Sequence, residues 1–586
     1  MRPMRQLALS AALVLTAGIG LDAGVSALAA TAPPAFGYGT PTYVNSAAPA
    51  SFFGATTAGE PSIGVDWKTG AAMYMGGTST ARLTFDNSAT TADKMVTWTD
   101  VSSPYSEINL DPILATDHAT GTTIAGGDDG PCAVMSVTTN DGGPFPDPVS
   151  WTPSAPCPFT ADHPTVGMGP YAGTPPLNAT SPFITYFCQQ SDVDSCSHSV
   201  DGGLTWSPSV PDPNFTCLSL FGHVKVSPDG TAYIPSANCF DANGTAEVGA
   251  ITSTDNGQSL SGLAIPNAPT PADGFDPSIA TDNSNRVYET WSRAGDYHPV
   301  ITWSDDHGGH WAPQVELGTD LAKPLRAATF ESAVAGDAGR AAVAYLGTYD
   351  GAAGADPFTA GFHGIWYLFV STTYDGGQTW HTVQATPEPV QRGEIDAGGT
   401  TTSGQRNLLD FMDASLTKDG RLVVAYADGC LDVCNGSSGT EAESTNQYAT
   451  VAYQNTGRGM FSAYDVTPVT APAAPTLTAS TGTAGVGLSW NVPNDGGSAI
   501  TGYQLLRGTT SGTESLLTTL PAAATSYTDS AVTGGTTYYY RVAAVNAIGV
   551  GDLSNEATAT PATTPAAPAA TVAVAGNGSV TPKRAR

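Results

Sequence analysis

The sequence predicts an all-β protein made of two unlike parts, and three observations support this prediction. A strand-like phrase recurs seven times between residues 60 and 419. A segment beyond residue 475 alternates apolar and polar residues, as half-buried strands do. The 586 residues include 66 Gly and 44 Pro, which favours turn-rich β structure. The repeats lack a 3.6-residue period, which excludes helical repeats.

The first 30 residues have the pattern of an export signal. A basic Met1–Arg5 precedes an apolar run over Leu7–Leu21, and the small residues of Ala27–Ala29 come before Thr31. We therefore expect residues 1–30 to be a signal peptide and the mature protein to be secreted and extracellular. No later stretch has the roughly 18 apolar residues that span a bilayer, so no transmembrane segment is expected.

The charge balance excludes one class of partner. The chain has 21 Lys and Arg against 52 Asp and Glu, a formal net charge of −31. Phosphate backbones are bound by clustered basic residues, so a nucleic-acid partner is not expected. With 41% hydrophobic residues, the chain can still bury sizeable cores.

The eight cysteines predict disulfides, because secretion exposes them to an oxidising compartment. Eight cysteines allow 105 connectivities. Proximity in the sequence favours four pairs: Cys132–Cys157, Cys188–Cys196, Cys217–Cys239 and Cys430–Cys434. A zinc site is the competing interpretation, but no paired Cys-x-x-Cys motif occurs, so no metal site is predicted there.

The recurring phrase is an acidic or His residue, an apolar strand, and a turn residue six positions on. Its seven copies begin at Glu60, Asp111, His163, His223, Asp276, Glu331 and Asp413. Most copies lie about 50 to 60 residues apart, which suits a blade of four short strands. Residues 31–466 are therefore predicted to form a seven-bladed β-propeller, with each phrase as the innermost strand of a blade.

A second phrase, Ser/Thr-x-Asp-x-Gly-x-x-Trp, follows several copies of the first. It is complete at Ser199–Trp206, Ser304–Trp311 and Thr373–Trp380, with weaker copies at Ser253–Leu260, Asp141 with Trp151, Asp86 with Trp98, and Asn455 with Phe461. The Ser and Asp oxygens can accept backbone N–H groups in a tight turn, and Gly accepts positive φ. The phrase is therefore expected to be structural, with its Trp packed between sheets.

These boxes resemble those of the sialidase (BNR/Asp-box) superfamily, over roughly residues 40–465. The resemblance implies a β-propeller, with six blades as the alternative because sialidases have six. It also implies a glycoside hydrolase whose arginines bind a sugar carboxylate, and Arg293, Arg326 and Arg406 are the matching candidates on successive repeats. The family's Phe/Tyr-Arg-Ile-Pro start is replaced by Glu60-Pro-Ser-Ile.

A Pro/Ala-rich linker at residues 467–475 leads to a second domain at residues 476–562. This domain resembles a fibronectin type III sandwich in its strand-like segments Val486–Trp490, Tyr503–Leu505 and Tyr538–Asn546. Four alternating side chains and one Trp should form its core: Tyr538, Tyr540, Val542, Ala544 and Trp490. Tyr538 is a candidate tyrosine corner, and residues 563–586 read as a disordered tail.

If the seven phrases are innermost strands, their first residues surround one mouth of a central channel. Glu331, Asp276, Asp413, Glu60 and Asp111 are the catalytic candidates, and His163 and His223 are candidates for substrate binding. Crowded carboxylates raise one another's pKa or recruit a cation, and paired carboxyls with different pKa values carry out glycoside hydrolysis. Alternatively, the ring only hydrogen-bonds neighbouring blades and channel water.

Two long loops, Gly347–Gly364 and Thr386–Asn407, are expected on the same face as the ring. The first carries Tyr349, Phe358 and Phe362, whose rings could stack on a sugar or simply cover apolar surface. No cofactor is required by any motif. Ca²⁺ is an option at the loop acids Asp192, Asp194, Asp428 and Asp432, although such pairs are usually solvated turns.

The sequence thus favours a secreted, monomeric, sialidase-like propeller protein that acts on or binds extracellular glycans, with glycoside hydrolysis at channel-mouth carboxylates. The alternative is a non-catalytic adhesion or scaffold protein built from the same parts.

Overall fold

The computed structural model describes residues 36–563, except 90, 106–109, 129–132, 144–149, 155–161, 191–194, 215, 219–221, 272–276, 353–354, 360–361, 396–407, 409–410, 432–446, 467 and 483–484. The protein is all-β, as predicted. In the described part, the helical elements are α1 (Ala92–Met95) and a 3-10 turn, η2 (Ser462–Tyr464), and Ser150 is also in 3-10 conformation. The predicted signal peptide and tail lie outside the described residues, apart from residue 563.

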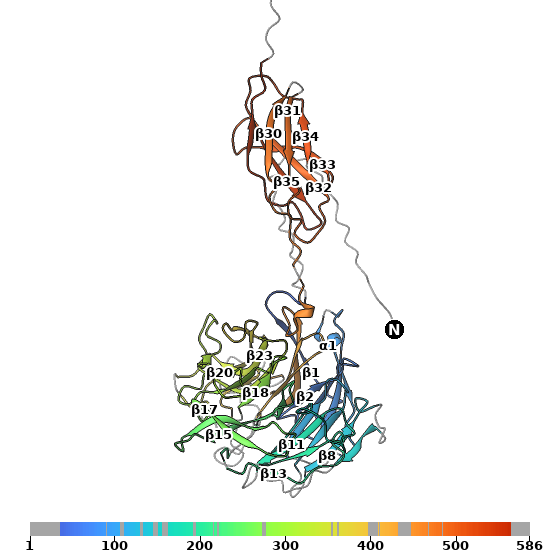
Figure 1. Ribbon diagram of the computed structural model, residues 1–586, viewed down its shortest axis with the longest axis vertical. Coiled ribbons are helices and arrows are strands. Elements are labelled where there is room, and N and C mark those ends of the chain that lie inside the picture. Colours follow the sequence, from blue (N-terminus) through green and yellow to red (C-terminus); the bar gives the residue numbers. More distant parts are fainter. Residues whose placement is uncertain are drawn as a thin grey trace, which may run out of the picture.

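Strands β1 to β29 form seven antiparallel sheets in the described part of the chain, shown in the lower half of Figure 1. In chain order, the first four sheets contain β2 (Ser62–Val65), β3 (Ala72–Gly76), β4 (Ser79–Phe85) and β5 (Val96–Asp100); β6 (Leu110–Thr116), β7 (Thr123–Asp128), β8 (Ala133–Thr138) and β9 (Thr152–Ser154); β10 (Asp162–Gly169), β11 (Ile184–Gln190), β12 (Ser195–Ser199) and β13 (Val210–Pro211); and β14 (Lys225–Val226), β15 (Ala232–Phe240), β16 (Ala246–Ser253) and β17 (Ser261–Pro269).

The remaining three sheets follow the same order of strands. They contain β18 (Ser278–Thr281), β19 (Val287–Ser292), β20 (Pro299–Ser304) and β21 (Val315–Glu316); β22 (Ala327–Ala335), β23 (Ala341–Thr348), β24 (Ile365–Thr373) and β25 (His381–Gln384), with β26 (Gln391–Arg392) beside β24; and β27 (Asp413–Leu416), β28 (Leu422–Asp428), β29 (Tyr448–Thr456) and β1 (Thr42–Ala47). The β26 strand lies in the second long loop, where the sequence predicted none.

The first strands of successive sheets lie against one another. Strand β2 contacts β6, β6 contacts β10, β10 contacts β14, β14 contacts β18, β18 contacts β22, β22 contacts β27, and β27 contacts β2 again. Each predicted innermost phrase coincides with one of these strands. The starts of the phrases therefore lie at one end of this set of strands, and the turns with the recurring Asp lie at the other.

The last of the seven sheets is completed from the other end of the chain. Strand β1 pairs with β29 in antiparallel register, with Val44 opposite Tyr453 and Ala47 opposite Thr450. Strand β28, which pairs with β29 on the other side, has all its side chains buried. The pairing joins residues about 400 positions apart, which local sequence patterns do not encode.

The box turns have the hydrogen bonds expected of their residues. The Ser199 hydroxyl accepts the N–H of Gly203 at 2.9 Å and donates to Asp201 at 2.8 Å, and Asp201 accepts the N–H of Thr205 at 2.9 Å. The turns at Ser253, Ser304 and Thr373 repeat the hydroxyl–glycine bond. Each of these turns therefore connects the third strand of its sheet to the fourth through hydrogen bonds between residues that are close in the sequence.

The C-terminal domain is a sandwich of two antiparallel sheets (Figure 1). One contains β30 (Leu477–Gly482), β31 (Gly485–Trp490) and β34 (Ser526–Asp529), and the other β33 (Ser515–Pro521), β32 (Gly502–Gly508), β35 (Tyr538–Val545) and β36 (Ala557–Ala559). All five predicted core residues are buried: Trp490, Tyr538, Tyr540, Val542 and Ala544. The Tyr538 hydroxyl accepts the N–H of Thr533 at 3.0 Å, as a tyrosine corner requires.

Disulfides Cys188–Cys196 and Cys217–Cys239 are present, and both belong to the set expected from sequence proximity. Cys430 is also disulfide-bonded, while Cys434, Cys132 and Cys157 lie outside the described residues. Disulfides suit an extracytoplasmic protein. No helix in the described part of the chain is long and apolar enough to cross a membrane.

Candidate functional site

The end of the ring at which the innermost strands begin is called the mouth face here. Asp413 begins β27, and Asp428 ends the antiparallel β28, so both lie at this face. Loops 349–364 and 385–412 leave their sheets at the same face. The turn aspartates, such as Asp282, lie at the opposite end, called the box face.

Two of the predicted ring residues meet across the ring. His223 Nδ1 lies 3.1 Å from Asp413 Oδ1, and Lys225 Nζ lies 3.9 Å from the same oxygen. Strands β14 and β27 are not neighbours, because β18 and β22 separate them on one side and three strands on the other. The predicted convergence of the phrase starts therefore holds for this pair.

The Asp413 carboxylate is buried and well satisfied. Its Oδ2 accepts the N–H of Ile63 at 3.0 Å, and its Oδ1 accepts its neighbour Ala414 N–H at 2.8 Å. Burial alone would raise the pKa of Asp413, but His223, Lys225 and the hydrogen bond from Ile63 together lower it below its usual range. Asp413 therefore remains ionised at neutral pH and holds sheets together.

The backbone is irregular where several innermost strands begin. Register shifts interrupt β6 between Leu110 and Ile113, β10 between Asp162 and Thr165, and β22 between Thr329 and Ser332. Each shift includes a predicted ring position, namely 111, 163 or 331. Glu60 has a φ of +52° and Phe330 a φ of +59°, which non-glycine residues rarely adopt. Bulges of this kind re-aim side chains and cluster at functional sites.

Glu331 is buried, and its Oε1 lies 2.9 Å from the hydroxyl oxygen of Ser292 on the neighbouring sheet. Glu331 and His223 line the same small cavity, of about 20 Å³. Glu60 is buried as well. The side chains of Asp111 and His163 are not described, and Asp276 and Arg406 lie outside the described residues, so their predicted roles stay predictions.

A larger cavity of about 340 Å³ runs between the innermost strands. His223, Lys225 and Asp413 line it, and so do Trp67, His118 and Phe461. The Trp67 and His118 rings are stacked at 4.6 Å, and Phe461 meets Trp67 edge-on at 5.5 Å. Phe461, expected to take the place of a box Trp between sheets, instead lines this cavity.

Two of the three arginines of the predicted clamp, Arg293 and Arg326, lie in the described part of the chain. Arg293 is bound by two carboxylates, with its Nη2 at 2.5 Å from Asp296 and 2.8 Å from Glu316. Arg326 is exposed, and no ion pair is found for it in the described part of the chain. An arginine that is already paired is a poor receptor for a further carboxylate.

The loop aromatics pack mainly on their own sheet. Phe362 is buried with its ring 5.9 Å from that of Trp366, so it does not offer a surface for stacking. Tyr349 meets Phe369 edge-on at 5.4 Å, and Phe358 lies 5.9 Å from Tyr297. Tyr349 and Phe358 remain partly exposed, so their predicted part in substrate binding stays a prediction.

Asp428 is the group that sequence reasoning undervalued. It is buried at the end of β28, where its Oδ1 accepts the N–H of Cys430 at 2.8 Å. Burial raises the pKa of Asp428 to about 7. The side chain lines a pocket of about 130 Å³ at the mouth face, together with Tyr426 and the exposed Glu388 from the second long loop. Its position at the end of the apolar run Leu422–Ala427 was a signal that the sequence offered, beside its place among the loop acids.

The pocket around Asp428 is closed by contacts between two sheets. Asn45 of β1 donates to the carbonyl of Ala385 at 2.8 Å and accepts the Tyr426 hydroxyl at 3.0 Å. Asn45 thereby fixes the start of loop 385–412 against the last sheet. Pro387 and Pro389, on either side of Glu388, also line the pocket and restrict the backbone there.

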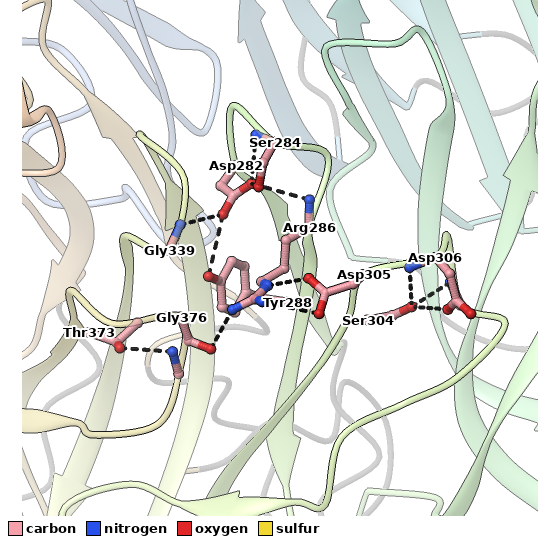
Figure 2. A network of polar contacts seen from close by, with 12 residues as sticks. Asp282, Ser284, Arg286, Tyr288, Ser304, Asp305, Asp306, Gly339, Thr373 and Gly376 are labelled. Atoms are coloured by element: carbon pink, nitrogen blue, oxygen red, sulfur yellow. Dashed lines mark hydrogen bonds and ion pairs between the residues drawn. The ribbon is translucent and has the colours of Figure 1, made fainter.

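The box face holds a different kind of polar network, drawn in Figure 2. Arg286 binds Asp305 through Nε at 2.6 Å and Nη2 at 3.0 Å, and its Nη1 donates to the carbonyl of Gly376 at 2.6 Å. Asp282 accepts the N–H of Gly339 at 2.7 Å. The contacts to Gly339 and Gly376 join two neighbouring sheets, so this network is structural.

No group of three or more His, Cys, Asp or Glu side chains that could hold a metal occurs among the described residues. Asp192, Asp194 and Asp432, considered for Ca²⁺, lie outside them. Asp428, the fourth of these acids, is buried rather than solvated.

The comparisons with known proteins identify one domain. Residues 470–560 match the family model of the fibronectin type III domain. No curated protein matches the chain. A solved Fn3-like protein from Clostridium thermocellum is 34% identical and covers 16% of this chain and 95% of its own, with a TM-score of 0.14.

Two solved structures cover the larger N-terminal part. The Hadza microbial sialidase Hz136 is 15% identical over 68% of this chain and 66% of its own, with a TM-score of 0.33. A protein of unknown function from Dyadobacter fermentans is 13% identical over 71% of this chain and 97% of its own, with a TM-score of 0.35. Likenesses at this level carry no argument about activity.

Proposed function

Because residues 470–560 belong to the fibronectin type III family, we propose that this chain joins such a module to an extracellular, glycan-hydrolysing domain. The seven sheets would be the blades of a seven-bladed β-propeller, rather than six, since their first strands contact one another in sequence and β27 contacts β2. The disulfides and the predicted signal peptide support secretion. The fibronectin type III domain would act as a spacer or a surface-binding module.

The observation that carries the proposal is the Asp428 carboxyl. A general acid must hold a proton at the working pH, and an ordinary Asp does not. Burial raises the pKa of Asp428 to about 7, and its side chain lines a pocket beside the long loops of the mouth face. Raised carboxyls in apolar surroundings are the usual acids of glycoside hydrolysis.

Glu388 lines the same pocket and is exposed, so it is suited to the complementary role. Asp428 would donate its proton to the glycosidic oxygen as the bond from that oxygen to the anomeric carbon breaks. A water molecule would attack the anomeric carbon and give its proton to the Glu388 carboxylate. The leaving sugar then carries the proton from Asp428, and the charge of the pair is restored by proton exchange with solvent.

The ring carboxylates are a second set of candidates. Asp413 is engaged by two N–H groups, His223 and Lys225, and its pKa is lowered, which does not suit an acid. Glu331, Glu60, Asp111 and Asp276 stay candidates for hydrolysis at the mouth. In the interpretation favoured here, the ring instead holds the sheets in place beneath the site.

Hydrolysis of a panel of extracellular glycans by the full-length, monomeric protein tests the proposal. Asp428→Asn and Glu388→Gln should each lower kcat by at least about 100-fold without unfolding the protein. Asp93→Asn, which neutralises an exposed carboxyl of α1, is the matched control and should keep full turnover.

Three outcomes separate the alternatives. Loss of turnover in Glu331→Gln, with Asp428→Asn still active, would assign the catalytic carboxyl to the ring residues instead of Asp428. Glycan binding without hydrolysis in the wild-type protein would favour the non-catalytic adhesion or scaffold role. Neither binding nor hydrolysis across the panel would reject a glycan-directed function.

A further inference from the structure

The two ring nitrogens of His223 have different surroundings. Its Nδ1 faces Asp413 at 3.1 Å, whereas its Nε2 is buried and has no hydrogen-bond partner among the described residues. Because the carboxylate can only accept, the geometry selects the tautomer with its proton on Nδ1, and that tautomer presents a lone pair at Nε2. A buried nitrogen without a partner forfeits a hydrogen bond, so a bound species is expected there.

The neighbouring cavity is of the size of a single small species. It measures about 20 Å³, enough for one water molecule or one metal ion. His223 and Glu331 line it from two different sheets, and Phe330, Phe411 and Met412 supply apolar walls. The Phe411 ring meets that of His223 edge-on at 4.9 Å, which fixes the plane of the imidazole.

The backbone brings Glu331 to this cavity by a bulge. The register of β22 shifts between Thr329 and Ser332, and Phe330 within the bulge has a φ of +59°. A regular strand would turn alternate side chains to opposite faces, so the extra residue re-aims this segment. Strain of this kind is retained where the surroundings hold it in place.

The arrangement matches the chemistry of a transition-metal site. Metal-binding histidines commonly donate their other N–H to a carboxylate, which orients the ring and makes the binding nitrogen more basic. Asp413 stands in this relation to His223. Imidazole nitrogen together with a carboxylate oxygen suits Zn²⁺ and similar borderline ions, whereas Ca²⁺ prefers oxygen ligands alone.

We propose that the cavity between His223 and Glu331 binds a divalent transition metal ion, through His223 Nε2 and the Glu331 carboxylate. Asp413 is a positioning residue for His223. Two protein ligands come from the described residues, so water or a bound ligand would complete the coordination. The site is separate from the Asp428 pocket, and metal binding here does not depend on the proposed hydrolysis.

Zinc binding to the chelator-treated, full-length protein tests the proposal by calorimetry. One saturable Zn²⁺ site is expected, and millimolar Ca²⁺ should not compete for it. His223→Gln and Glu331→Gln should each weaken binding at least tenfold, and Asp413→Asn by about 10- to 100-fold. The matched control is His310→Gln, because His310 pairs with Asp306 on an exposed turn of the box face and should not contribute.

A second measurement covers variants that fail to fold. Co²⁺ bound to the wild-type protein should show a visible absorption band that Zn²⁺ displaces and Ca²⁺ does not. Zinc binding that persists in His223→Gln and disappears in His310→Gln would overturn the proposal. The absence of any saturable Zn²⁺ or Co²⁺ binding to the wild-type protein would also overturn it, and the cavity would then hold a water molecule.

Discussion

Asp413 and His223 lie 3.1 Å apart although their strands, β27 and β14, are separated by other sheets on both sides. The pair connects the fourth and last sheets across the central cavity. Replacing Asp413 with Asn leaves Lys225 without its counter-charge and His223 without its carboxylate acceptor, and breaking such a buried contact costs about 3 kcal/mol. We therefore expect Asp413→Asn to lower the free energy of unfolding by about this amount, measured by urea denaturation.

The control for this pair is an exposed one. Asp305 binds Arg286 at the box face, and Asp305→Asn should cost less than about 1 kcal/mol, because exposed ion pairs are weak. The pKa of Asp413 is lowered in the folded protein, so its contribution is present above pH 4 and lost as the pH falls further. Equal costs for both variants would contradict the assigned role.

Asp428 predicts the opposite dependence on pH. In the unfolded chain it ionises near pH 4, but in the folded protein only near pH 7. The free energy of unfolding therefore decreases as the pH rises from 4 to 7, and it stays lower above pH 7. Asp428→Asn should be more stable than the wild type at pH 8, by up to about 4 kcal/mol, and nearly equal to it at pH 4.

Thermal unfolding of both proteins from pH 4 to 8 measures this difference. Asp93→Asn serves as the control, because Asp93 is an exposed residue of α1 that does not line the Asp428 pocket. A constant difference between Asp428→Asn and the wild type at every pH would show that Asp428 is not protonated in the folded state.

Glu289 on β19 is fully buried, and within the described part of the chain neither of its carboxylate oxygens has a hydrogen-bond partner. Burial raises the pKa of Glu289 well above its usual value, so the folded protein keeps it neutral at a cost in stability that grows above pH 4. Glu289→Met fills similar volume without a polar group. We expect a higher Tm at pH 8 and a smaller gain at pH 4, measured by calorimetry.

A Glu289→Gln variant checks the cause of that gain. Gln removes the ionisation but keeps a buried polar group, so its Tm should lie between those of the wild type and Glu289→Met at pH 8. A lower Tm for Glu289→Met than for the wild type would mean that the carboxyl is satisfied in solution by water.

The two disulfides should contribute unequally. Cys217–Cys239 spans 22 residues of sequence and Cys188–Cys196 spans 8. In the chain-entropy model, the longer loop gives about 1 kcal/mol more stabilisation. We expect the double Ala variant of the longer pair to lose more stability in urea denaturation than that of the shorter pair. The reverse order would show that native packing outweighs loop length.

The sequence predicted the features that neighbouring residues encode. The box turns depend on hydrogen bonds within about five residues, as at Ser199 and Gly203, so a short motif predicts them. The first strands of the seven sheets coincide with the recurring phrase, and the sandwich core, with Tyr540 and Val542 buried, follows from alternation along a single strand. Even the meeting of His223 with Asp413 was implied by the repeated position of each in its phrase.

Only the tertiary structure decided which carboxyls carry protons and which are paired. The burial of Asp428 depends on Asn45 and the loop at Glu388, and the lowered pKa of Asp413 depends on His223 and Lys225. These partners lie between about 40 and 380 residues away along the chain. Desolvation and charge act through space, so a local pattern names an acid but does not determine its ionisation. The pairing of β1 with β29 likewise joins strands from opposite ends of the N-terminal part of the chain, and no local sequence pattern predicts it.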